Sequence, residues 1–348
     1  MNATGISYSL SIQPMYIGSH SMGSLISAFA SVMTSGWLTT PSLWLHLITA
    51  ILFVFGFILT IRKKAPPATG IERIIPFGRL FFAVPLGLFG TQHFVFLNEV
   101  KNAVPRWMPG HVFWACLVGV ALIAACLSIL TEIKADLAAL LVGIMLFLFV
   151  AMIYVPNLLR HPHDRFAISL LFRDLSLSGA ALAFAGTQGA GDRGRPVRWL
   201  VDVGRWFFGA AMLYFGVEHF LHTEFAPGVP LEMLMPPWIP GHMAWAYVTG
   251  TVLVVGGLII LSGVLGNKGS TKAAAWLGAT FLLLVAFVYV PMELVHPSIV
   301  ISGELDYVAD TLAMSGAAFF VAGAIAQRQR PSPSNQRSHS ISAEGARA

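Results

Sequence analysis

The sequence predicts an all-α integral membrane protein, with two parallel tandem four-helix transmembrane bundles and one further transmembrane helix at the N-terminus. Of its 348 residues, 56% are hydrophobic and only 11% are charged, whereas roughly a quarter of the residues of a soluble domain are charged. Apolar runs of the length that crosses a bilayer, about 20 residues, recur along the chain. A block of sequence near the start also returns in the second half.

The repeated block reads GRLFFAVPLGLFGTQHF at 78–94 and GRWFFGAAMLYFGVEHF at 204–220, so the two copies differ by one offset (204 − 78 = 126). Further matches follow in the same order: PRWMPGH at 105–111 with PPWIPGH at 236–242, and YVP at 154–156 with YVP at 289–291. A repeat of this length indicates a duplicated structural module.

Nine spans are expected, one at the N-terminus and four in each half. They lie at 43–61, then at 77–96, 111–130, 137–156 and 166–185, and finally at 201–221, 242–261, 273–291 and 303–326. The resulting divisions are an N-terminal segment 1–70, a first module 71–186, a linker 187–200, a second module 201–326 and a tail 327–348. The tail is rich in Ser, Arg and Pro, which is typical of disorder. Residues 23–38 favour an interfacial helix over an additional span.

Basic residues indicate the orientation of the bundle. We call face A the side that carries 62–79, 134, 193–205, 268–272 and the tail, and it holds 16 of the 21 Lys and Arg. The opposite side, face B, holds Lys101, Arg106, Arg160, Arg165 and Arg173. Positive charge is enriched on the cytoplasmic side, so we expect a cytoplasmic (plasma) membrane protein with its N-terminus outside and its C-terminus in the cytoplasm. The basic residues form no single stripe, which argues against nucleic-acid binding.

Histidines favour face B, and other polar residues share their depth. His93 and His219 each follow an arginine by 14 residues, which places them about 21 Å into a hydrocarbon layer of about 30 Å. A tyrosine, an aspartate and an amide or carboxylate lie at a similar level in each half. With the Trp and His of the two Trp-x-Pro-Gly-His segments, the candidate pocket residues are Gln92, His93, Trp107, His111, Tyr154, Asp174, Glu218, His219, Trp238, His242, Tyr289 and Asp310.

Two interpretations of these residues remain open. They either hydrogen-bond one helix to another, or they line a polar pocket that opens to face B, because ionisable groups at such depth usually face a cavity or the bundle interior. The tryptophans favour an aromatic belt. No His-x₃-His pair lies within a span, so a metal site or a haem bound by a His pair is disfavoured.

The repeated pattern resembles the DoxX-like membrane proteins, which are compact four-helix modules. It consists of a leading Gly-Arg, then Gly-x-x-His-Phe, a glycine-bearing second span and a His-Pro after the third span, over about 75–186 and again over 201–326. The family takes its name from a subunit of thiosulfate:quinone oxidoreductase. Members often carry a carboxylate in the second span, but 119–125 and 251–257 contain none.

The resemblance implies a membrane component of a redox system, whose pocket holds a quinone headgroup or a small sulfur compound. Quinone is then the candidate cofactor, and the lipid bilayer and a redox partner protein are the expected partners. His93 and His219 would give or take protons, oriented by Asp174 and Asp310. A small-solute transporter or binding protein without redox chemistry and a structural assembly subunit are the alternatives. The sequence leaves open whether the chain is an enzyme.

Overall fold

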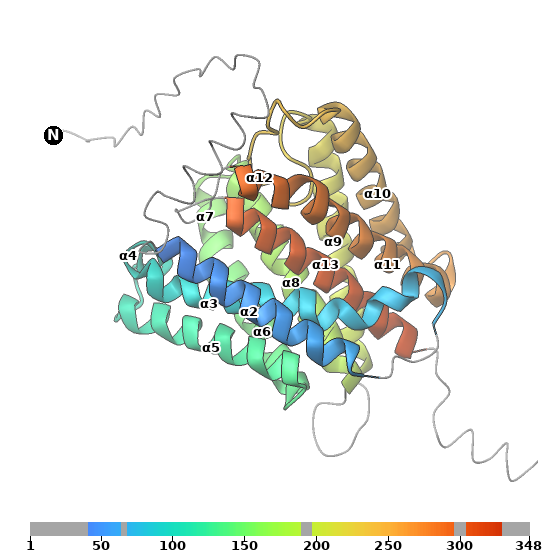
Figure 1. Cartoon of the computed structure of the whole chain (residues 1–348). Helices are drawn as coiled ribbons and strands as arrows, with labels where there is room; N and C mark the ends of the chain where they lie inside the picture. Colours follow the sequence, from blue (N-terminus) through green and yellow to red (C-terminus); the bar gives the residue numbers. More distant parts are fainter. Residues whose placement is uncertain (1–40, 64–67, 189–196, 296–303, 329–348) are drawn as a thin grey trace, which may run out of the picture.

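The computed structural model describes residues 41–63, 68–188, 197–295 and 304–328. Within these residues nine helices are long and apolar enough to cross a membrane, which confirms the predicted all-α membrane architecture (Figure 1). Residues 23–38, most of the linker 187–200 and the tail beyond 328 lie outside the described residues.

Most helices begin and end close to the predicted spans, but α11 begins at Gly266, seven residues before the predicted start at 273. Their bounds are α2 Pro41–Ile61, α3 Gly78–Val95, α5 His111–Thr131, α6 Ala135–Phe149, α8 Arg165–Gln188, α9 Arg198–Leu221, α10 His242–Ser262, α11 Gly266–Leu284 and α13 Glu304–Gln327. Short elements complete them: the 3₁₀ helices η2 Gly70–Phe77 and η3 Lys101–Ala103, the π-helical turns η4 Val150–Tyr154 and η5 Val285–Tyr289, and the helices α4 Leu97–Val100, α7 Val155–Arg160 and α12 Val290–Val295.

The third span of each half continues past the proline at which the sequence predicts its end. In the first half the Val155 N–H donates to the carbonyl of Val150, five residues back, so one turn is π-helical. Pro156 has no N–H to donate, and its ring needs room against the preceding turn. The wider turn accommodates the ring, and the span continues as α7. Val290 and Val285 form the same turn ahead of Pro291 in the second half.

The two halves interlock. Packed neighbours follow the order α3, α5, α6, α8, α9, α10, α11 and α13, and α13 returns to α3. The fourth span of each half therefore packs against the first span of the other half, and α8 also packs against α13. α2 lies outside this ring, against α3 (Figure 1). α4, α7 and α12 share one end of the bundle, which corresponds to face B.

Glycines allow the closest helix contacts between the halves. A Cβ added at Gly204 on α9 would lie 2.3 Å from the carbonyl oxygen of Gly179 on α8. A Cβ added at Gly316 on α13 would lie 2.3 Å from the backbone nitrogen of Phe82 on α3. Because these neighbours are backbone atoms, which cannot move aside as a flexible side chain does, both contacts require glycine. Small residues serve the same purpose at many membrane helix interfaces.

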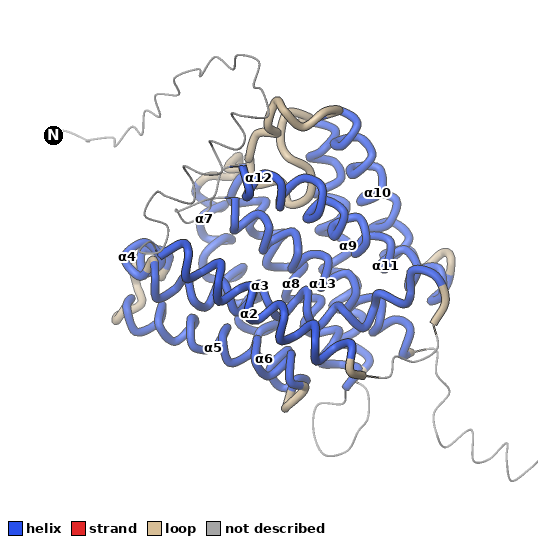
Figure 2. The backbone as a smooth tube through the Cα atoms, viewed as in Figure 1, coloured by secondary structure: helices blue, strands red, loops and turns tan. Residues whose placement is uncertain are grey.

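The loops that follow the first spans differ between the halves. His93 and Trp107 are 14 residues apart, whereas His219 and Trp238 are 19 apart. The shorter loop forms α4 and η3, and none of the residues in these two helices is buried. The longer loop, residues 222–241, turns back between the helix ends (Figure 2), and its segment 226–231 is buried.

Replacing Gly204 with alanine should destabilise the α8–α9 contact. The added methyl group collides with a backbone carbonyl, and such overpacking costs about 1–3 kcal/mol. Gly323→Ala is the control, because a Cβ at Gly323 meets only the side chain of Ile75, at an ordinary 3.5 Å. In detergent we expect Gly204→Ala to lower the apparent melting temperature and Gly323→Ala to leave it nearly unchanged. Equal melting temperatures for the two variants would contradict this account of the interface.

Candidate functional site

Three charged side chains meet between α8 and α13. Arg173 Nε donates to Asp174 Oδ1 at 2.9 Å, and Arg173 Nη1 lies 3.2 Å from Asp310 Oδ2. Both aspartates are only 2% exposed. The hydroxyl of Tyr154, at the end of η4, interacts with Asp174 and Arg173. One guanidinium and two carboxylates give this charged cluster one net negative charge when all three are ionised.

The charged cluster lies well inside its span. Arg173 is eight residues beyond the start of α8 at Arg165, a distance of about 12 Å along a helix that rises about 1.5 Å per residue. Charged residues at such depth are costly and usually face the interior of a bundle or a cavity. Here they cross the interface between the halves, because α8 belongs to the first half and α13 to the second.

Asp174 and Asp310 are not equivalent positions, although their similar depth suggested that they are. The Ser-Gly-Ala-Ala segments at 178–181 and 315–318 correspond, since each serine hydroxyl donates to a carbonyl of the preceding span, at 2.7 and 2.8 Å. Their offset is 137, and counting back from Asp310 (310 − 137 = 173) gives Arg173. The two halves therefore place opposite charges at matching positions, and these charges pair with each other.

The polar residues of the second half hold the long loop. His219 Nε2 accepts a hydrogen bond from the Gly228 N–H at 2.7 Å, and the Tyr289 hydroxyl donates to the Pro227 carbonyl at 2.7 Å. Both side chains are buried. Of the two interpretations, the pocket would require space between His219 and Tyr289, but residues 226–229 of the chain itself lie there.

These contacts use both nitrogens of the His219 ring. Nδ1 lies 2.5 Å from the Phe215 carbonyl, so Nδ1 carries the proton, while Nε2 accepts from Gly228. The imidazole is therefore neutral and has no nitrogen free to exchange a proton with a ligand. Nor does Asp310 orient it, because Asp310 pairs with Arg173. The predicted acid–base role of His219 is thus replaced by anchorage of the loop.

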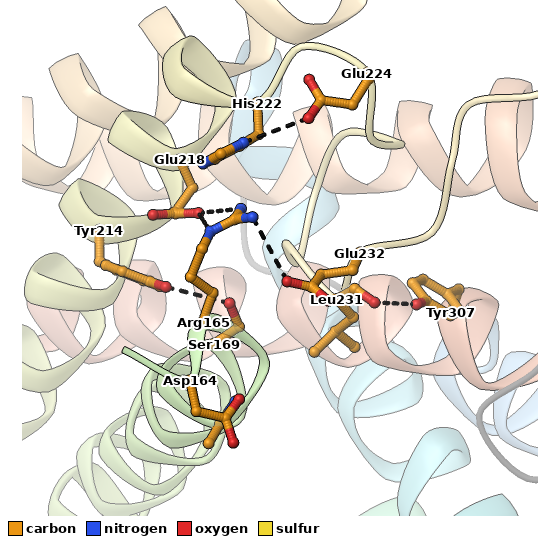
Figure 3. Close-up of polar contacts among 11 residues, drawn as sticks. Asp164, Arg165, Ser169, Tyr214, Glu218, His222, Glu224, Leu231, Glu232 and Tyr307 are labelled. Carbon is orange, nitrogen blue, oxygen red and sulfur yellow. Dashed lines mark hydrogen bonds and ion pairs between the residues drawn. The ribbon is translucent and has the colours of Figure 1, made fainter. Parts of the chain in front are cut away.

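Glu218 belongs to a separate group of charges near face B (Figure 3). Arg165 Nη2 donates to Glu218 Oε2 at 2.7 Å, and Arg165 Nη1 lies 3.6 Å from Glu232 in the loop. The Arg165 guanidinium also lies 5.6 Å above the centre of the Phe225 ring. Further along the loop, the Tyr307 hydroxyl donates to the Leu231 carbonyl at 2.5 Å. These contacts fasten the loop to α8, α9 and α13.

The other predicted residues contact different partners. Gln92 is buried and its amide nitrogen donates to Asp306 on α13. His93 is half-buried and its Nδ1 bonds the Phe89 carbonyl at 2.7 Å. Trp107 and Trp238 are exposed, and His111 and His242 begin α5 and α10 in half-buried positions. The twelve predicted residues are therefore distributed over several contacts instead of lining one pocket.

Sequence reasoning missed Arg173, Arg165 and Asp306. By sequence, Arg173 counts among the basic residues of face B, whereas its neighbour Asp174 is predicted to lie inside the span. The same count of residues from the start of the helix would have placed Arg173 there as well. Asp306 gives no comparable signal, because its partner Gln92 is 214 residues away. Within the described residues, no group of three or more His, Cys, Asp or Glu side chains is placed to hold a metal ion.

Comparison of the chain with protein-family models, with curated proteins and with solved structures found no match in any of the three.

Replacing Tyr289 with phenylalanine should loosen the long loop. The change leaves the buried Pro227 carbonyl without its donor, and an unsatisfied buried polar group costs about 1–3 kcal/mol. We expect a lower apparent melting temperature and faster chymotrypsin cleavage within 222–241. Tyr247→Phe is the matched control, because Tyr247 is 43% exposed. Cleavage at the same rate in both variants and in the unchanged protein would refute the anchoring role of Tyr289.

Proposed function

We propose that the chain is the membrane component of a redox system and that the charged cluster of Arg173, Asp174, Asp310 and Tyr154 exchanges protons with a bound quinone headgroup or small sulfur compound. One observation carries this proposal. A guanidinium shared by two buried carboxylates joins the two halves about 12 Å inside the span. A membrane protein rarely retains three charges at this depth without a functional need.

The charges of the cluster suit proton exchange. Arg173 compensates one of the two carboxylates, so the cluster reaches neutrality by taking up a single proton. Asp306 lies one helical turn from Asp310, at i and i+4 on α13, where side chains are neighbours. Asp306 is also closer than Asp310 to the start of α13, which lies at face B. The two carboxylates and the Gln92 amide thus form a polar route from face B to the cluster.

The donors at the cluster also suit a quinone. Reduction of a quinone to a quinol takes up two electrons and two protons, and a redox partner protein would supply the electrons. Quinone carbonyls need hydrogen-bond donors, which the Arg173 guanidinium and the Tyr154 hydroxyl provide. Because these donors lie within the membrane-spanning part of the bundle, they are placed where a hydrophobic carrier dissolves.

Membership of the DoxX-like family and duplication of a four-helix module are part of the same proposal. The π-helical turns before Pro156 and Pro291 and the matching serine hydrogen bonds of 178–181 and 315–318 support duplication. The excess of basic residues on face A supports a plasma-membrane protein with its C-terminus in the cytoplasm, in which the polar route starts outside the cell.

A proton-coupled solute transporter is the second candidate. The observation that favours it is the Arg173–Asp310 pair, which bridges parallel halves that move relative to each other in many transporters. Proton binding at Asp310 would weaken this bridge and release the halves. Reconstitution in liposomes distinguishes the two functions, because solute uptake driven by a pH gradient belongs to a transporter alone.

Replacing Asp310 with asparagine should weaken quinone binding while the bundle stays folded. Arg173 keeps Asp174 as its partner, so no charge is left alone. We expect a short-chain ubiquinone analogue to bind purified protein about tenfold more weakly, because Arg173 loses the Asp310 carboxylate that helps to hold its guanidinium in place; the lost contact is one charge-assisted hydrogen bond of the protein itself. Titration calorimetry in mild detergent measures the affinity, and mass spectrometry of the unchanged protein identifies quinones or sulfur compounds that co-purify with it.

Asp202→Asn is the matched control, since Asp202 pairs with Arg328 at the other end of the bundle and its side chain is 47% exposed. Gel filtration of both variants establishes that they remain folded. Equal affinity of Asp310→Asn and Asp202→Asn would reject the cluster as the binding centre. No detectable quinone binding to the unchanged protein, together with flux in liposomes, would favour the transporter. Absence of both would leave a structural assembly subunit.

A further inference from the structure

A second site lies at the opposite end of the bundle, away from the charged cluster. A cavity of about 380 Å³ opens at face A between α2, η2, α3, α8 and α13 and the end of α5. Its size falls at the lower end of the range of about 300–1,000 Å³ typical of small-molecule pockets. None of the residues in the charged cluster lines it, so it is independent of the function proposed above.

Two cationic side chains and one anionic side chain line this cavity. Lys63 and Arg79 both form ion pairs with the carboxylate of Glu132, which leaves one positive charge uncompensated. Burial and, secondarily, the charge of Arg79 lower the pKa of the Lys63 ammonium. The guanidinium of Arg79 lies 5.5 Å above the centre of the Phe184 ring, a geometry that stabilises a cation on an aromatic face. An anion entering the cavity would therefore relieve the repulsion between the two cations.

The backbone at Glu132 is strained. Glu132 follows the end of α5 with a φ of 62°, in the left-handed region that favours glycine. At the corresponding place after α10 the second half has Gly263, with a φ of 61°. The backbone of Glu132 therefore adopts a conformation that costs of order 1 kcal/mol or more for a residue with a side chain. This backbone conformation accompanies ion pairs of the Glu132 carboxylate with both Lys63 and Arg79. In the second half, Arg205 lies near Gly263 and donates to the Ile260 carbonyl instead.

The rest of the cavity is apolar. Phe184, Phe319 and Phe320 form one wall, and the rings of Phe184 and Phe320 stack with their centres 4.2 Å apart. Gly323 and Ala324 follow on α13, and because glycine has no side chain and alanine only a methyl group, they leave the space open. A ligand that fills this cavity must therefore have a charged end and a hydrocarbon part.

We propose that this cavity binds an anionic amphiphile, with its phosphate or carboxylate at Lys63 and Arg79 and its hydrocarbon against Phe184, Phe319 and Phe320. The shared chemistry, an oxyanion, is also that of free phosphate, but the aromatic wall favours a molecule with an acyl chain. The uncompensated positive charge disfavours zwitterionic lipids of the same chain length.

Native mass spectrometry of the full chain in detergent tests this site. The probes are phosphatidylglycerol, phosphatidylcholine with the same acyl chains, and inorganic phosphate. We expect phosphatidylglycerol to bind at least about tenfold more tightly than either of the others, as for the gain of one charge-assisted contact. Lys63→Gln should remove most of this preference, because Arg79 and Glu132 then balance each other in charge. The Lys63 side chain is 49% exposed, so its replacement leaves the fold intact.

Further variants test the binding of the lipid headgroup and of its acyl chain separately. Arg62→Gln is the matched control, since Arg62 is the exposed neighbour of Lys63 and does not line the cavity; it should bind the anionic lipid as the unchanged protein does. Gly323→Leu, or the smaller Gly323→Val, fills the cavity with its charges intact and should abolish binding. The proposal fails if Arg62→Gln and Lys63→Gln weaken binding equally, if phosphatidylcholine binds as tightly, or if inorganic phosphate binds equally well and is unaffected by filling the cavity.

Discussion

Hydrocarbon offers no hydrogen-bond partner, so a polar group buried in this bundle is costly unless another part of the chain pairs with it. The cost of burying a charge is large, and pairing is the usual way to offset it. Arg173 and its two aspartates satisfy this requirement across the interface of the halves. The same requirement explains why the carbonyls of Pro227 and Leu231 in the buried loop receive hydroxyl donors. The positions of the charged cluster and of the buried loop segment both follow from this constraint.

The two halves use similar helices for different purposes. Glycines at Gly204 and Gly316 allow the first span of one half to approach the fourth span of the other, which creates the ring and brings α8 against α13. The second half differs by five additional loop residues, and the buried segment 226–231 of its longer loop occupies the interior of that half. The charged cluster thereby lies at the interface between the halves, and His219 of the second half anchors the loop.

The same asymmetry extends to face A. Gly263 ends α10 without strain, whereas Glu132 occupies the corresponding left-handed position after α5 and engages two cations. The first half therefore has a charged cavity where the second half has a backbone contact of Arg205. The halves differ here at helix ends and loops, where a difference disturbs the packed core least.

The sequence by itself determined the nine spans, their order and the two similar halves, because hydrophobic length and repeated motifs are local properties. It also indicated that Asp174 and Asp310 lie deep within their spans, and both are buried. Only the tertiary structure decided that Asp310 pairs with Arg173, that Gln92 meets Asp306 and that a loop fills the space beside His219. These contacts join residues between 9 and 214 positions apart. Depth along a helix can be counted from the sequence, but the direction of a side chain depends on which helix packs against it.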